Sequence, residues 1–315
     1  MKNINIQNLP RGTGLFAALL VLIVVSSFVS PVFFTTVNLL NVMRQVAMYG
    51  VLGVAMTFVI LTKGIDLSVG ATVALSGVCG ALLMEAGWPL WAMVPACLAI
   101  GTLIGAVNGF GIAVSKIPAF IMTLGIMVMV RGLTLMFADG GTVNPGAPAE
   151  RFFWLGGGYL AGVPTPIYVF ALVCLIAAIV LGYTSFGRAV YAVGSNDEAA
   201  RLSGINVRHT IFSVYCICGF LSALAGLVFL SRLSVGDPNS GLGLELEAIT
   251  IAVIGGTSLF GGEGTILGTI GGAMILAIIA NVLNLAGVSP FSQMVVKGAI
   301  IILAVLLEGA RKLRK

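Results

Sequence analysis

Side chains able to carry out catalysis are scarce in this sequence. The chain has one histidine, His209, and its five cysteines all lie within apolar runs. An enzymatic site brings a nucleophile, a base and an orienting group together, and no such set can be assembled around His209. Cysteines in apolar surroundings are usually small buried hydrophobes, and we interpret these five in that way. The sequence therefore predicts neither a catalytic site nor a metal site, and a chain that is not an enzyme.

One glycine-rich stretch has the first half of a nucleotide-binding loop. A Walker A loop needs Gly-x-x-x-x-Gly-Lys-Ser/Thr, whose backbone amides surround the phosphates. The stretch from Gly256 to Gly261 supplies both glycines, but Gly262-Glu263 follows, and no Gly-Lys pair occurs anywhere in the chain. We therefore expect this chain to hydrolyse no ATP and to hold no cofactor. Its glycines favour a turn or a close helix contact instead.

Polar side chains in or beside the long apolar runs form a second group of candidates. In lipid such side chains cost free energy, so they favour the interior of a helix bundle. Asparagine offers both a donor and an acceptor to a passing polar solute, yet asparagines also join helices to one another. Both roles stay open, and the aspartate can alternatively cap a turn. The candidates for a translocation pathway are Asp66, Asn108, Asn281 and Asn284.

Arg131 also lies within an apolar run. A charge at the centre of a membrane helix costs roughly 2.5–3.5 kcal/mol on insertion, so it needs a partner. Asp139, eight residues further on, is one candidate for that partner.

The most polar stretch of the chain runs from Thr184 to His209. Asn196 or Ser195 can cap a helix at its start, and Gly204 can end that helix in a left-handed conformation. Between them, acidic residues favour the helix dipole in the first turn and alanines favour the helix. These residues are Asp197, Glu198, Ala199 and Ala200.

The predicted helix is too short to cross a membrane and too charged to enter one. In isolation a helix of two turns is marginal in water, so we expect it to dock against another surface. The alternative is a solvated helix within a loop that has no partner.

Composition decides what surrounds these groups. The chain is 59% hydrophobic and only 9% charged, whereas soluble domains are roughly 45–50% apolar and about 25% charged. So few charges cannot cover a water-facing surface, whereas lipid accepts an apolar one. The net charge of +5 comes without a basic patch interleaved with aromatic residues, which argues against nucleic-acid binding. We therefore expect a protein embedded in a lipid bilayer.

The apolar runs predict an all-α, polytopic membrane helix bundle that forms one domain over residues 1–315. A helix needs about 20 apolar residues to cross the bilayer core. The eighth of the ten expected spans contains Gly255-Gly256 and is short enough to be broken. The ten spans are Leu15–Phe34, Val46–Thr62, Leu67–Glu85, Trp91–Ser115, Ala119–Phe137, Ile167–Tyr183, Thr210–Leu230, Leu246–Phe260, Thr265–Leu285 and Phe291–Leu307.

Basic residues set the orientation of these spans, because lysine and arginine concentrate in cytoplasmic loops. An even number of spans places both termini on one side, and that side holds eleven of the sixteen basic residues. We therefore expect both termini and the 184–209 segment to be cytoplasmic. The eleven residues are Lys2, Arg11, Lys63, Lys116, Arg188, Arg201, Arg208, Arg311, Lys312, Arg314 and Lys315.

One internal echo points to a repeat. The stretch from Gly64 to Gly70 is similar to the stretch from Gly256 to Gly262, at an offset of 192 residues. Interrupted helices at matching positions of two repeats indicate a translocation path in transporters. Both stretches face the cytoplasm in the expected topology, whereas many such repeats are inverted.

Four longer motifs resemble one family of membrane proteins. The segment 186–207 is similar to the coupling loop of ABC-importer permeases of the ribose-type monosaccharide family, Gly-Asn-x-x-Ala-Ala-x-x-Ser-Gly-Ile, with Ser195 in place of the glycine before the asparagine. Further matches are Ile60–Gly70, Lys116–Leu124 and Glu247–Gly262. The resemblance extends from about Thr36 to the C-terminus.

This resemblance implies a permease subunit that moves a monosaccharide into the cytoplasm across a bacterial plasma membrane. It implies a cytoplasmic ATP-binding subunit that uses the ATP, a second permease subunit, and an external sugar-binding protein. Movement of the coupling loop would reach the flanking spans Ile167–Tyr183 and Thr210–Leu230. The residues expected to couple to the ATPase are Gly194, Asn196, Asp197, Glu198, Ala199, Ala200, Ser203 and Gly204.

Other functions are weighed against this one. The same permease class can carry a nucleoside, an amino acid or a sugar-like signal molecule. An ion-coupled secondary transporter would want acidic or histidine residues buried in mid-span, and few are found here. The sequence does not distinguish a homodimer from a heterodimer, or one sugar from another.

Overall fold

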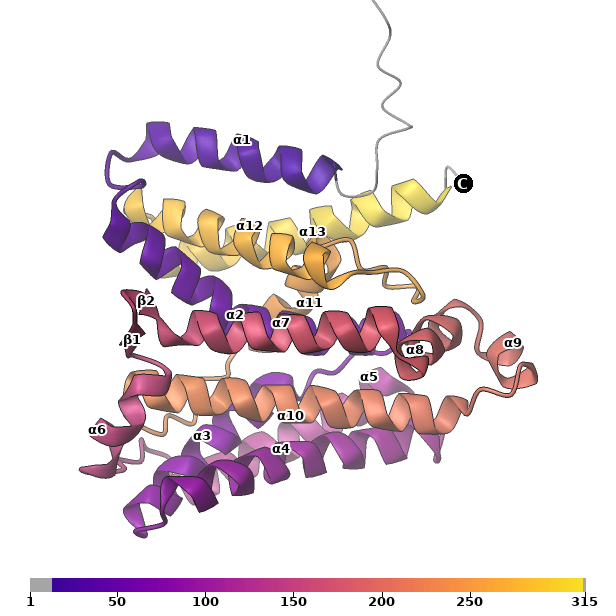
Figure 1. Ribbon diagram of the computed structural model, residues 1–315, viewed down its shortest axis with the longest axis horizontal. Coiled ribbons are helices and arrows are strands. Elements are labelled where there is room, and N and C mark those ends of the chain that lie inside the picture. The colour runs from indigo at the N-terminus through magenta and orange to yellow at the C-terminus, as the bar shows by residue number, and fades with distance from the viewer. Residues whose placement is uncertain (1–12, 314–315) are drawn as a thin grey trace, which may run out of the picture.

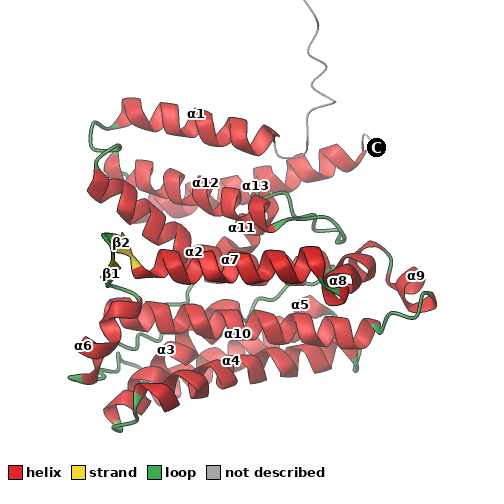
Figure 2. Ribbon diagram, viewed as in Figure 1, coloured by secondary structure: helices red, strands yellow, loops and turns green. Residues whose placement is uncertain are grey.

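A computed structural model describes residues 13–313, and these residues are mostly helical (Figures 1 and 2). Six helices are long and apolar enough to cross a membrane, namely α2 (Thr36–Leu61), α4 (Leu90–Ala113), α5 (Ala119–Phe137), α7 (Thr165–Tyr183), α10 (Val207–Leu233) and α12 (Ile266–Leu285).

Three further helices are apolar, but their apolar parts within the described residues are shorter. The remaining elements are small. The apolar three are α1 (Thr13–Val29), α3 (Val69–Glu85) and α13 (Pro290–Leu313). The small elements are α6 (Pro148–Phe152), the 3-10 helix η2 (Phe153–Leu155), α8 (Ser185–Ser195), α9 (Asp197–Leu202) and α11 (Leu244–Ile254). An antiparallel hairpin joins β1 (Tyr159–Leu160) to β2 (Val163–Pro164).

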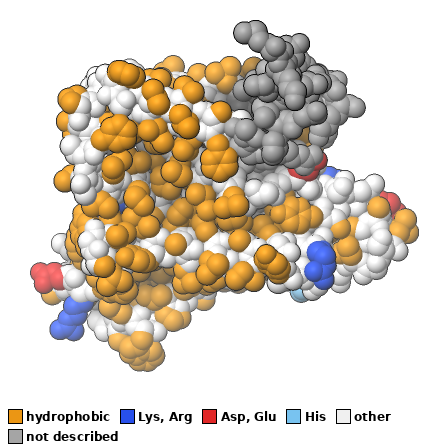
Figure 3. All heavy atoms as spheres, turned by 45° about the horizontal axis from the view of Figure 1, so that its top comes forward, with side chains coloured by type: hydrophobic (Ala, Val, Ile, Leu, Met, Phe, Trp, Pro, Cys, Tyr) orange, Lys and Arg blue, Asp and Glu red, His pale blue; other side chains and the backbone are white. Residues whose placement is uncertain are grey.

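The long helices run side by side between two ends of the molecule (Figure 1). The β1–β2 hairpin and α6 lie at one end, called here the hairpin end. At the other, the α9 end, α9 projects beyond the bundle (Figure 1). Hydrophobic side chains cover much of the face in Figure 3, as expected for a surface that meets lipid.

Helix α10 forms the centre of the bundle and packs against α2, α3 and α4. Small residues allow the closest approach, because membrane helices associate through backbone contact. A Cβ on Gly101 of α4 would lie 2.5 Å from both the Gly219 carbonyl oxygen and the Ala223 Cβ of α10. A Cβ on Gly105 would overlap the carbonyl oxygen of Tyr215. Two glycines one helical turn apart in α4 therefore set the spacing between α4 and α10.

Three of the differences between the predicted spans and the observed helices have a cause in the local sequence. Helix α1 ends at Val29, before a turn that contains Pro31, because the residue before proline is biased away from helical conformation. Helix α2 begins ten residues before the predicted Val46, where the Thr35 side chain accepts a hydrogen bond from the Asn38 amide. The first turns of α2 contain polar residues, so the start of the helix lies outside the apolar run that predicted the span.

The eighth expected span, Leu246–Phe260, is the third difference. Helix α11 has only 11 residues and ends at Ile254. Gly256 has a φ of +87°, a conformation that glycine adopts without strain, and residues 257–264 are irregular. The broken helix that Gly255-Gly256 suggests is therefore present.

Candidate functional site

Helix α9 is capped at both ends, as the sequence predicts. The Oδ1 of Asn196 accepts a hydrogen bond from the Ala199 amide at 3.0 Å, which identifies Asn196 rather than Ser195 as the cap. Gly204 has a φ of +83°, and its amide donates to the Arg201 carbonyl oxygen. These contacts hold a six-residue helix that would be marginal alone.

The two faces of α9 differ. Ala200 is buried, so this face of the helix packs against the rest of the chain. The opposite face is exposed, and Leu202, which sequence reasoning did not select, is 79% exposed there. The projecting helix therefore presents a large apolar side chain at its exposed face. The other exposed candidates of this segment are Asn196, Asp197, Glu198, Ala199, Ser203 and Gly204.

Gly194, near the C-terminal end of α8, joins α9 to two other parts of the chain. A Cβ on Gly194 would overlap the carbonyl oxygen of Leu61 and lie 2.6 Å from the amide nitrogen of Gly262. The Gly262 amide itself donates to the Leu61 carbonyl oxygen at 3.0 Å. The end of α2, the end of α8 and the 256–264 turn therefore meet as backbone on backbone. We call Leu61, Gly194 and Gly262 the glycine junction.

Lys63 and Tyr191 reinforce the glycine junction from either side. The Lys63 ammonium donates to the Ser195 carbonyl oxygen at 3.4 Å and lies 3.9 Å from the Asp197 carboxylate. The Tyr191 hydroxyl donates to the Gly264 carbonyl oxygen at 2.9 Å. Burial raises the pKa of Tyr191, so the hydroxyl stays a donor at neutral pH. Contacts of the α8–α9 segment therefore reach both the end of α2 and the turn between α11 and α12.

The glycine junction also shows where the two similar stretches of the sequence lie in the fold. The stretches Gly64–Gly70 and Gly256–Gly262 follow α2 and α11, and both begin at the α9 end. This agrees with the expectation that they face the same side. The Gly262 amide of the second stretch donates to Leu61, which lies three residues before the first stretch begins.

Two of the pathway candidates belong to one buried cluster. Asp66 and Asn108 are 1% and 0% exposed. The Asp66 carboxylate accepts from the amide and the hydroxyl of Ser68 at 2.8 and 2.6 Å, and the Cys218 thiol also hydrogen-bonds to it. The Asn108 amide nitrogen donates to the Ser68 hydroxyl at 2.8 Å. Asp66 thus caps the turn before α3, and this cluster fixes the 62–68 segment.

The other two asparagines lie apart from that cluster. Asn281 of α12 exchanges side-chain hydrogen bonds with Asn38 of α2 at 2.7 and 3.1 Å, so it joins these two helices. Asn284 is exposed. Arg131 makes no ion pair with Asp139 in the part of the chain that the structure describes.

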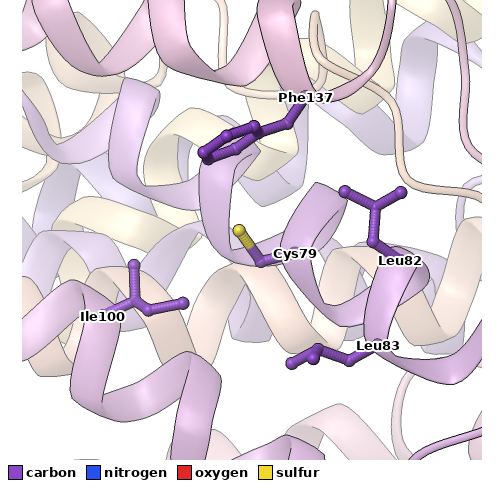
Figure 4. Close-up of a pocket in the computed structure, with 5 residues that line it drawn as sticks. All are labelled: Cys79, Leu82, Leu83, Ile100 and Phe137. Atoms are coloured by element: carbon purple, nitrogen blue, oxygen red, sulfur yellow. The ribbon is translucent and has the colours of Figure 1, made fainter. Parts of the chain in front are cut away.

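An apolar recess lies among α3, α4 and α5 (Figure 4). Its lining offers no strong donor or acceptor, so it does not suit a polyhydroxylated solute. The lining residues are Cys79, Leu82, Leu83, Ile100 and Phe137.

Comparison with known proteins gives the family. The model of one family, described as the permease component of branched-chain amino acid transport systems, matches residues 38–305. The chain belongs to this permease family. As a member it is a multi-pass membrane protein, in agreement with its apolar helices.

Individual relatives confirm the resemblance to ribose-type permeases. The ribose import permease protein of Escherichia coli strain K12 is 46% identical, over 94% of this chain and 92% of the relative. That of Haemophilus influenzae is 43% identical, over 95% and 94%. The xylose transport system permease protein of Escherichia coli strain K12 is 37% identical, over 88% and 86%.

One solved structure shares the fold. It is an inward-facing conformation of a metal-chelate type ABC transporter, with a TM-score of 0.50 over 94% of this chain and 95% of that one. The two sequences are 14% identical, so the likeness concerns the fold alone.

Proposed function

We propose that this chain is the membrane-spanning permease subunit of an ATP-binding-cassette importer that moves a monosaccharide, a ribose-like pentose or a hexose, into the bacterial cytoplasm. The observation that carries the proposal is the 43–46% identity to ribose import permeases along almost the whole chain. The xylose permease relative favours a sugar cargo over the amino acids named in the family description.

The proposed topology has ten spans, with both termini and α9 on the cytoplasmic side of the inner membrane. Nine apolar helices and the short α11 would supply these spans. The concentration of basic residues at one side supports the orientation. The proposed partners are a cytoplasmic ATP-binding subunit, a second permease subunit and an external sugar-binding protein.

In the proposed mechanism the partner subunit hydrolyses ATP and this chain responds. The ATP-binding subunit would hold the exposed face of α9, including Leu202, and move it. The glycine junction would carry that movement to α2 and to the 256–264 turn, while α7 and α10 would move as the helices that flank α8 and α9. The spans would then open alternately to the two sides of the membrane.

Reconstitution tests this proposal. The chain, its ATP-binding subunit and its external binding protein are placed in liposomes with ATP on the side of the ATP-binding subunit. We expect uptake of labelled D-ribose or D-xylose against a gradient, and loss of uptake when any one partner or ATP is omitted. Uptake of an amino acid with no uptake of either sugar would instead support the second cargo class.

A further inference from the structure

Two non-helical segments enter the bundle from opposite ends. After α2, residues 62–68 run inward from the α9 end to the start of α3. After α10, residues 234–243 run inward from the hairpin end, where Gly236 pairs with Val143, to the start of α11. The segments meet at Gly70 and Gly241. A Cβ on Gly70 would overlap the carbonyl oxygen of Gly241. A Cβ on Gly241 would likewise overlap the carbonyl oxygen of Gly70.

This meeting point lies at half the height of the bundle. The Asp66 side chain contacts Cys218 of α10, and a Cβ on Gly226 of α10 would overlap the carbonyl oxygen of Val73 in α3. Gly70 therefore stands level with the stretch of α10 between these two contacts, which is the middle of α10. In transporters, irregular backbone at this depth occurs where it is buried in protein or lines a cavity.

A charged side chain lies at the same meeting point. A Cβ on Gly70 would also overlap the Oε2 of Glu245, the second residue of α11. That oxygen is buried and has no hydrogen-bond partner. Glu247, two residues further along α11 and on a different face of the helix, instead forms a half-buried ion pair with Lys297 of α13. Ionisable groups at membrane depth are costly and mark solute pathways.

The first turn of α11 is also open on one side. Leu242 is 59% exposed and Leu246 is 51% exposed, so described residues of the chain do not cover this turn. An acidic residue in the first turn of a helix favours the dipole, but that alone would not leave one carboxylate oxygen without a donor. A hydroxyl group is a donor of the kind that this oxygen lacks.

We propose that Glu245 contacts the cargo, and that its carboxylate accepts hydrogen bonds from hydroxyl groups of a polyhydroxylated solute passing the Gly70–Gly241 contact. This inference rests on the proposed transport function and adds to it a cargo-contacting residue.

The test measures D-ribose uptake and ATP hydrolysis together in the reconstituted importer. Glu245→Gln retains the volume of the side chain and removes its charge. We expect the ribose moved per ATP hydrolysed to fall about tenfold, since a hydrogen bond to a charged group is lost, while ATP hydrolysis stimulated by the binding protein stays at the wild-type rate. Glu245→Asp should recover part of the ratio, and Glu150→Gln, at an exposed position of α6, should leave it unchanged.

Three results would count against the inference. An unchanged ratio in Glu245→Gln would remove Glu245 from the pathway. A parallel fall of uptake and ATP hydrolysis would assign Glu245 a role in the fold alone. If the wild-type importer moves neither ribose nor xylose, the proposed function itself fails and this inference falls with it.

Discussion

Gly194→Ala is expected to abolish ATP-driven uptake. The added Cβ would overlap the Leu61 carbonyl oxygen and press on the Gly262 amide, and both atoms are backbone that cannot move aside as a flexible side chain does. Overpacking of this kind costs typically 1–3 kcal/mol. The glycine junction joins α8 to α2 and to the 256–264 turn. If the added Cβ pushes Gly194 away from Leu61 and Gly262, α9 should no longer be coupled to the membrane helices. The measurement is sugar uptake in the reconstituted importer.

Gly182→Ala is the matched control, because a Cβ at Gly182 of α7 meets nothing within 4 Å. We expect this variant to insert and transport as the wild type does. Thermal unfolding of both variants in detergent shows whether Gly194→Ala acts on the fold as well. Wild-type uptake by Gly194→Ala would mean that the glycine junction does not transmit the movement of α9.

Leu202→Glu is expected to lower uptake more than tenfold while the chain still folds and inserts. Leu202 is 79% exposed, so the fold does not depend on its side chain. Apolar anchors in the centre of an interface often contribute 2 kcal/mol or more to binding, which corresponds to a loss of about thirtyfold in affinity. A carboxylate at this position would also be desolvated on docking. Co-purification of the ATP-binding subunit with the chain measures the expected loss directly.

Leu202→Met is the control for this substitution, because it keeps an apolar side chain of similar volume. It should retain both co-purification and uptake. If Leu202→Glu binds the ATP-binding subunit as tightly as the wild type, α9 is not the docking element.

Local features of the structure could be predicted from the sequence because neighbouring residues determine them. The cap by Asn196, the left-handed Gly204 and the break at Gly255-Gly256 are all effects of short range.

Contacts between distant segments could not be predicted in this way. The glycine junction joins Leu61, Gly194 and Gly262, and one sequence gives no signal that these three meet. The pairing of Asn281 with Asn38 depends on how α12 packs on α2, so its chemistry alone left two roles open. The exposure of Leu202 could not be predicted, because it depends on which face of the short helix α9 packs on the rest of the chain.

Photo-crosslinking from α9 tests the central claim most directly. A photoreactive amino acid is placed at position 202 in one variant and at position 160, an exposed leucine of the hairpin end, in another. In membranes that hold the complete importer, we predict a crosslink from position 202 to the ATP-binding subunit and none to it from position 160. Full sugar uptake by an importer in which position 202 never crosslinks to that subunit would contradict the account.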